Sequence, residues 1–97
     1  MNHIVVFKFE KNFMDAALVD NAKKVFQQLK RELPQDVLQV GVYENIVERD
    51  TNYDLLVSME LAKRDSLDKY LNHPVHVALV KEWIPHISSR ASLDYDM

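Results

Sequence analysis

The side chains best suited to chemistry lie in one short stretch, residues 70–76, which reads Tyr-Leu-Asn-His-Pro-Val-His. A neutral imidazole can take a proton from a carbon next to a carbonyl group, and a phenol can then hydrogen-bond the resulting enolate oxygen. His76 and Tyr70 flank a proline-started break, so both could point into one cavity. The alternative is that both are packing residues whose polar ends satisfy backbone groups. We take His76 and Tyr70 as the candidate catalytic pair.

The other three histidines have simpler explanations. His73 immediately precedes a proline, which is typical of a turn or helix-cap residue. His3 lies on an apolar strand face and is either a satisfied core histidine or part of a pocket. His86 is expected on the surface at a helix end, where its charge suits the helix dipole. The spacing of His73 and His76 would permit a metal ion, but no third ligand is evident, so no metal site is predicted.

Composition excludes several classes of protein. The 97 residues fit one domain, residues 1–97, and 47% hydrophobic with 28% charged residues is ordinary for a soluble globular chain. There is no cysteine, and the single glycine leaves no phosphate-cradling or dinucleotide-binding loop, so we expect no cofactor. A net charge of −3 without a basic stripe argues against nucleic acid as a partner. Strand-sized apolar runs and an alternating N-terminus predict no membrane partner and a cytoplasmic location.

Hydrophobic periodicity predicts the elements that must position these groups. Alternating patterns predict strands at about 2–10, 37–47, 53–61 and 88–95. Three- and four-residue steps predict helices at about 15–33, 64–71 and 74–84. The order is β-α-β-β-α-β with the second helix broken near Asn72–Pro74, since proline is favoured in a first helical turn. This is a ferredoxin-like α+β fold with a four-stranded antiparallel sheet.

Local details of these elements carry further expectations. Asn12 is a better N-cap for the first helix than Met14. Gly41 falls in mid-strand, which predicts a bulge or a close backbone approach. Two helices cover only one face of four strands, yet the first strand is apolar on both faces near its start. We therefore expect a homodimer formed through the uncovered sheet face.

Motifs along nearly the whole chain resemble the stress-responsive A/B barrel (Dabb) family of small dimeric α+β barrels. They include residues 3–9 (His-Ile-Val-Val-Phe-Lys-Phe), Gly41, 52–54 (Asn-Tyr-Asp), 70–76 and 94–95 (Asp-Tyr). One plant member, olivetolic acid cyclase, closes a linear polyketide by an intramolecular aldol reaction without a cofactor. The resemblance places its catalytic histidine at His76, its catalytic tyrosine at Tyr70 and a pocket histidine at His3. The chain departs from that enzyme at Leu55, where the plant protein has another pocket histidine.

The resemblance implies a ligand site and leaves three functions open. Ligand contacts are expected from His3, Leu55, Val57, Phe26 and Trp83, although Phe26 and Trp83 are most simply core residues. The first function is binding of a small, largely apolar, carbonyl-bearing molecule in a pocket between sheet and helices. The second is a cofactor-free enzyme, aldol cyclase-like or monooxygenase-like, that uses His76 and Tyr70. The third is a structural stress-response protein without a ligand.

Overall fold

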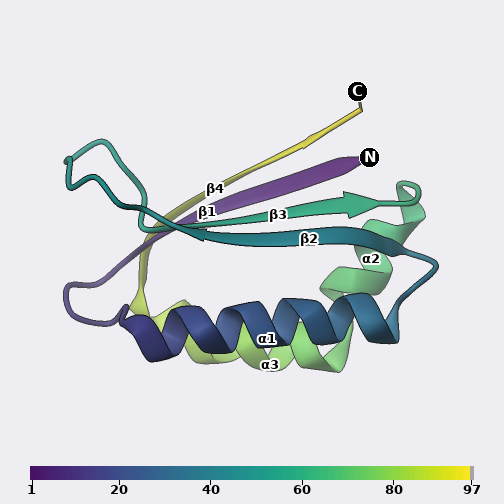
Figure 1. Cartoon of the computed structure of the whole chain (residues 1–97), viewed down its shortest axis with the longest axis horizontal. Coiled ribbons are helices and arrows are strands. Elements are labelled where there is room, and N and C mark those ends of the chain that lie inside the picture. The colour runs from purple at the N-terminus through teal and green to yellow at the C-terminus, as the bar shows by residue number, and fades with distance from the viewer. Residues whose placement is uncertain (97) are drawn as a thin grey trace.

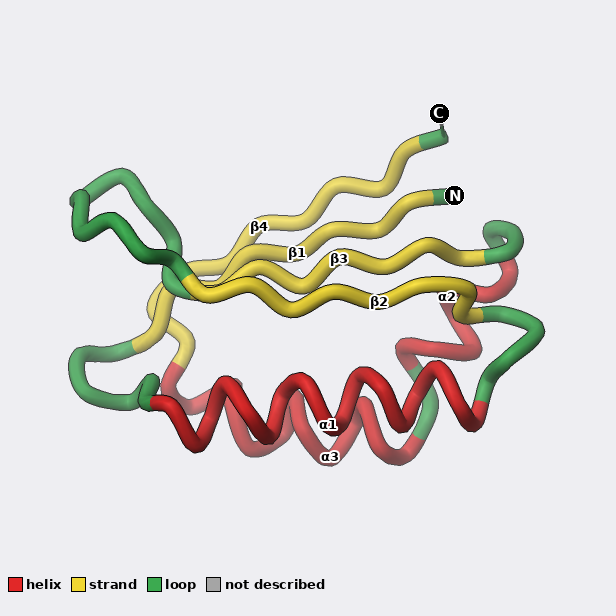
Figure 2. Tube along the Cα trace, viewed as in Figure 1, coloured by secondary structure: helices red, strands yellow, loops and turns green. Residues whose placement is uncertain are grey.

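Four antiparallel strands form one sheet with helices against one face (Figures 1 and 2). The computed structural model describes residues 1–96. The elements in chain order are β1 (Asn2–Phe9), α1 (Ala16–Glu32), β2 (Val37–Glu44), β3 (Leu55–Leu61), α2 (Asp65–Leu71), α3 (Pro74–Trp83), the 3₁₀ turn η1 (Ile84–His86) and β4 (Ile87–Tyr95). The strand order is β2-β3-β1-β4, so β2 and β4 are the edges. This is the predicted ferredoxin-like α+β fold, with the second helix divided into α2 and α3.

The core lies between the sheet and the long helix α1. Alternate residues of β3 turn inward and are buried, as the period-2 pattern predicts: Leu55, Val57, Met59 and Leu61. α1 meets them with a stripe at three- and four-residue spacing: Val19, Ala22, Phe26 and Leu29. Leu18, the residue before Val19, is only half-buried.

Capping side chains define the helix starts. Asp15, and not Asn12, caps α1, because its carboxylate accepts a hydrogen bond from the Leu18 amide at 2.8 Å. Asn12 instead has a φ of 69°, a left-handed conformation that asparagine tolerates in turns. At the break between α2 and α3, Pro74 is the first residue of α3. His73 caps that helix, as its position predicts, by accepting a hydrogen bond from the Val75 amide at 3.1 Å.

Gly41 is not at a bulge. The irregularity in β2 lies between Val37 and Gln39. A Cβ at Gly41 would instead meet the Tyr43 ring, 2.6 Å from its hydroxyl oxygen. The close approach is thus made by a side chain of the same strand and not by another backbone. A ring covering a glycine on an edge strand restores some of the packing that glycine lacks.

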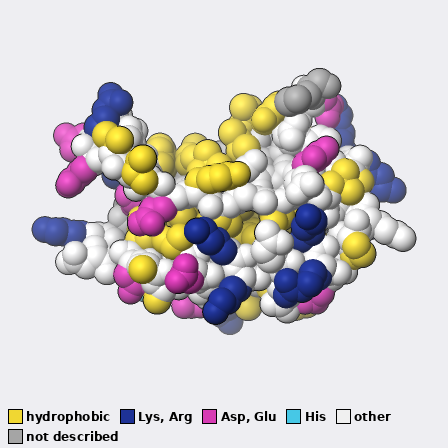
Figure 3. All heavy atoms as spheres, in the orientation of Figure 1, with side chains coloured by type: hydrophobic (Ala, Val, Ile, Leu, Met, Phe, Trp, Pro, Cys, Tyr) yellow, Lys and Arg dark blue, Asp and Glu magenta, His cyan; other side chains and the backbone are white. Residues whose placement is uncertain are grey.

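The sheet face opposite the helices is apolar at its centre. β1 contributes Ile4 and Val6 to this outer face, and their partners across the sheet include Leu93, Leu56 and Ala91. Figure 3 shows hydrophobic side chains in the hollow above the sheet, beside the raised 45–54 connection. β2 ends at Glu44, before the predicted limit of Val47, and the connection rises on this side (Figure 2). The outer face therefore combines an apolar floor with one raised wall.

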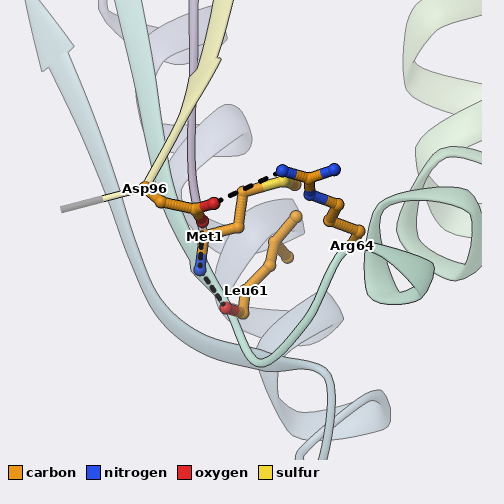
Figure 4. A network of polar contacts seen from close by, with 4 residues as sticks. All are labelled: Met1, Leu61, Arg64 and Asp96. Carbon is orange, nitrogen blue, oxygen red and sulfur yellow. Dashed lines mark hydrogen bonds and ion pairs between the residues drawn. The ribbon is translucent and has the colours of Figure 1, made fainter.

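A network of polar contacts joins the start of β1, the end of β3 and the residue that follows β4 (Figure 4). The Met1 ammonium group donates a hydrogen bond to the Leu61 carbonyl oxygen at 2.9 Å and lies 3.9 Å from an Asp96 carboxylate oxygen. Arg64, at the start of α2, lies 3.6 Å from the other Asp96 oxygen. The end of β4 is thereby linked to both β1 and α2. Because these ion pairs are exposed, they contribute little stability.

Candidate functional site

A cavity of about 410 Å³ opens between the inner side of β1 and β4 and the helices α2 and α3. It is large enough for a small organic ligand. Five of the seven residues predicted for the site line this cavity: His3, Phe26, Tyr70, His76 and Trp83. The stretch 70–76 supplies both candidate catalytic groups, because the turn between α2 and α3 folds them over the same space.

Leu55 and Val57 do not line this cavity. Both are inward-facing residues of β3 and are at most 1% exposed. Leu55 borders a separate hollow at the base of the 45–54 connection, and Val57 is wholly enclosed. The cavity lies at the β4 side of the sheet, so β1 separates β3 from it. The sequence predicted ligand contacts from both residues, but it did not indicate that the cavity opens on the β4 side of the sheet.

Three rings follow one another along the cavity wall. The ring centroids of His3 and Tyr70 are 5.7 Å apart in an edge arrangement, and those of Tyr70 and His76 are 4.5 Å apart. Tyr70 is 1% exposed, and burial raises the pKa of its phenol. The phenol therefore stays protonated and can donate a hydrogen bond. Within residues 1–96 no side chain is buried with an unpaired polar atom, and no protein partner is seen for this hydroxyl, so its oxygen reaches the cavity.

His76 is held in one neutral tautomer. Its Nδ1 lies 2.9 Å from the Leu71 carbonyl oxygen, which can only accept, so Nδ1 carries the proton and donates. Nε2 is then left as an acceptor with a free lone pair. Burial lowers the pKa of His76, the Leu71 hydrogen bond opposes this, and nearby His3 and His73 add to the lowering. The main cause of the lowered pKa is thus desolvation by burial.

His73 holds the opposite tautomer and anchors the turn. Its Nδ1 accepts from the Val75 amide, so in the neutral ring Nε2 carries the proton. That nitrogen lies 3.3 Å from a Glu32 carboxylate oxygen at the end of α1. The side chain therefore connects α1 to the first turn of α3. It positions His76 without lining the cavity.

A buried polar pair positions the helix that carries Tyr70. The Ser66 hydroxyl, fully buried in α2, donates a hydrogen bond to an Asp36 carboxylate oxygen at 2.7 Å. Lys69 lies 3.5 Å from the same oxygen. The Ser66 hydrogen bond and the Lys69 charge lower the pKa of Asp36, and its partial burial works against them. α2 is thus fixed to the loop before β2, which gives Tyr70 a defined place.

The polar wall of the cavity was missed by sequence reasoning. Alternate residues of β4 face inward opposite β1: Asp94 pairs with His3 in register, Ser92 with Val5 and Arg90 with Phe7. The Asp94 carboxylate also contacts His3 Nδ1 directly. An amphipathic edge strand normally turns its apolar side to the core. In β4 the apolar side faces away from the helices, and the polar side faces the cavity.

The fourth histidine, His86, lies apart from this site. His86 lies outside the cavity, stacked on Phe13 with centroids 4.1 Å apart and 3.2 Å from a Glu10 carboxylate oxygen. Among residues 1–96 no group of three or more potential ligands is placed to hold a metal ion. None of the described helices combines the length and apolar character needed to cross a membrane.

The family model described as "Stress responsive A/B Barrel Domain" (Dabb) matches residues 1–97. No curated protein matches the chain. Among solved structures, a Dabb-family protein from Mesorhizobium loti with a ferredoxin-like fold is 26% identical, with a TM-score of 0.68 over 99% of this chain and 94% of that one.

Two further solved structures are less similar in sequence. A dimeric ferredoxin-like protein from Thermobifida fusca is 20% identical, with a TM-score of 0.79 over 99% of this chain and 89% of that one. A hydroxynitrile lyase from Passiflora edulis is 14% identical, with a TM-score of 0.75 over 97% and 89%. At these identities the likeness shows the shared fold.

Proposed function

Because the chain belongs to the stress-responsive A/B barrel (Dabb) family, we propose that it is a dimeric barrel protein that binds a small, largely apolar, carbonyl-bearing molecule. The observation that carries the proposal is the cavity of about 410 Å³ in which Tyr70 and His76 face the same space. Its walls are mainly apolar, with a few polar groups to orient a ligand. The Tyr70 hydroxyl is a hydrogen-bond donor suited to a carbonyl oxygen.

The geometry also favours a second function, proton transfer without a cofactor. The Nε2 lone pair of His76 would remove a proton from the carbon next to the ligand carbonyl, and the Tyr70 hydroxyl would hydrogen-bond the enolate oxygen. The enolate carbon could then attack a second carbonyl of the same molecule, and the imidazolium would return its proton to the new alkoxide. A hydroxynitrile lyase on the same fold supports the idea that this scaffold can carry an enzyme.

The outer face of the sheet supports the dimer. Ile4, Val6 and Leu93 form an apolar floor there, and Leu93 is 57% exposed in the isolated chain. Faces of this kind usually mark an interaction site. A second copy related by a two-fold axis would bury the face against itself. The solved relative from Thermobifida fusca is described as dimeric.

Binding can be tested with the protein's own fluorescence. Trp83 is the single tryptophan and lines the cavity, so its emission should change when the cavity fills. We expect saturable titration with 2-nonanone and weaker binding of 2-nonanol, which lacks the carbonyl acceptor. Tyr70→Phe should reduce this preference while circular dichroism stays unchanged. If neither compound gave a saturable response, the binding proposal would be contradicted and the structural stress-response function would be favoured.

Turnover can be tested by hydrogen exchange at carbon. With the protein in heavy water, 2-nonanone should gain deuterium next to its carbonyl faster than in buffer, as NMR would show. His76→Gln should abolish the acceleration, and the control His86→Ala, which alters a histidine outside the cavity, should retain it. Equal exchange with wild type and His76→Gln would remove His76 as the base and leave a binding protein.

A further inference from the structure

An arginine lies at the end of the cavity farthest from the candidate base. Arg90 is on the inward row of β4, opposite Phe7, and lines the cavity. Among residues 1–96 its guanidinium forms no ion pair. Asp94, the one carboxylate on the same wall, is engaged with His3 at the other end. The cavity is therefore positive at one end and negative at the other.

Two independent elements give the distance between these ends. Arg90 and Asp94 are four residues apart on a strand, which corresponds to about 13 Å. On the facing helix α3, His76 and Trp83 are seven residues apart, which corresponds to roughly 10 Å. Trp83 packs against Phe7 with ring centroids 5.3 Å apart, so it lies at the Arg90 end. The wall between the two ends is apolar, with Phe26 and Leu79 among its residues.

We propose that the ligand is an elongated molecule with a carboxylate at one end, held by Arg90, and a neutral carbonyl at the other, facing Tyr70 and His76. The inference rests on the proposed function and specifies its ligand class. A guanidinium offers paired donors that match a carboxylate, and its charge stays on at any physiological pH. In the reversed orientation the ligand's carboxylate would lie beside the Asp94 carboxylate, so the orientation with the ligand's carboxylate at Arg90 is the favoured one.

The competing explanation is that Arg90 protects an exposed edge strand. Inward-pointing charges on edge strands oppose edge-to-edge aggregation. That role predicts aggregation of an uncharged variant and no preference for anionic ligands. The two explanations therefore differ in a measurable way.

The test compares 9-oxodecanoate with its methyl ester, which keeps the ketone and the chain but loses the charge. Both are titrated against Trp83 fluorescence with wild type, Arg90→Gln and Arg90→Lys. Arg49→Gln is the control, because Arg49 lies in the exposed 45–54 connection and is also an arginine whose charge is removed. We expect the acid to bind wild type about tenfold more tightly than the ester at low salt.

Arg90→Gln should lower the affinity for the acid to that for the ester and leave the ester unchanged. Arg90→Lys should fall between the two, and Arg49→Gln should match wild type. Equal affinity for acid and ester, or aggregation of Arg90→Gln without a change in the acid-to-ester ratio, would overturn the carboxylate inference while the proposed function stands. If neither compound binds wild type, both fail.

Discussion

The Nδ1 atom of His76 donates a hydrogen bond to the carbonyl oxygen of Leu71, 2.9 Å away across the break between α2 and α3. The carbonyl belongs to the end of α2, where backbone acceptors lack helical partners. The bond therefore satisfies an otherwise open acceptor and fixes the imidazole at the same time. Because Nδ1 is occupied, the basic nitrogen is Nε2. The break in the helix is thus what defines the tautomer of the candidate base.

The pH dependence of stability should carry the signature of His76. Burial lowers its pKa in the folded protein from the ordinary value of 6.5, so the unfolded chain takes up the proton first as pH falls. The stability that the neutral ring contributes is present above pH 6.5 and is lost as pH falls toward the lower folded pKa. In urea unfolding at a series of pH values, His76→Gln should lose less stability on acidification than wild type. An identical slope in both proteins would contradict this assignment.

The cap at His73 should affect the site, whereas the cap at Asp15 should not. Either His73→Ala or Asp15→Ala should cost about 1 kcal/mol of unfolding free energy, a typical value for a lost N-cap. Only His73→Ala should also weaken ketone binding, because that cap orients the turn carrying His76. His73→Asn should restore most of the stability, since asparagine supplies an acceptor of similar reach. Equal effects of both alanine variants on binding would show that His73 has no positioning role.

The proposed dimer depends on the outer face of the sheet. Leu93→Asp should place a carboxylate in an apolar contact at a cost of about 3 kcal/mol, roughly a hundredfold in dissociation constant. Light scattering after gel filtration would show the shift to monomer. Val77→Asp is the matched control, because Val77 is 48% exposed on the helix side of the molecule. A wild-type monomer at micromolar concentration, or dissociation by Val77→Asp alone, would contradict this interface.

Substitution of Gly41 should be tolerated. Its φ is not positive, so alanine fits the backbone, and the atoms that a Cβ would meet belong to the end of the Tyr43 ring, which is 62% exposed. The ring can turn aside, so Gly41→Ala should change stability by less than about 1 kcal/mol. Thermal unfolding of Gly41→Ala and of Gly41→Ala with Tyr43→Ala would measure this. A large loss in both variants would show that backbone crowding controls the position.

Hydrophobic periodicity predicted the fold, because residues on a buried face recur at the spacing of the helix or strand that carries them. Pro74 predicted the break in the second helix. The stretch 70–76 also pointed to Tyr70 and His76, since proline and its neighbours mark a break. The cavity's other walls were harder to predict. Leu55 and Val57 share the inward face of β3, but no local pattern shows which side of a sheet the helices leave open. Asp94 and Arg90 were passed over because the polar row of an edge strand resembles a solvent-facing row.

The two rows of side chains on β4 face different parts of the molecule. Ala91 and Leu93 pair with the outward-facing residues of β1, while Arg90, Ser92 and Asp94 alternate with them and line the cavity, which Ala91 also borders. A second copy packed against the outer row would restrict the movement of β4 and therefore of the cavity wall that β4 forms. Ligand affinity and self-association would then be thermodynamically linked, and each would strengthen the other by the same factor. Diluting the protein should lower its affinity for the ligand, and adding ligand should lower the dissociation constant of the dimer.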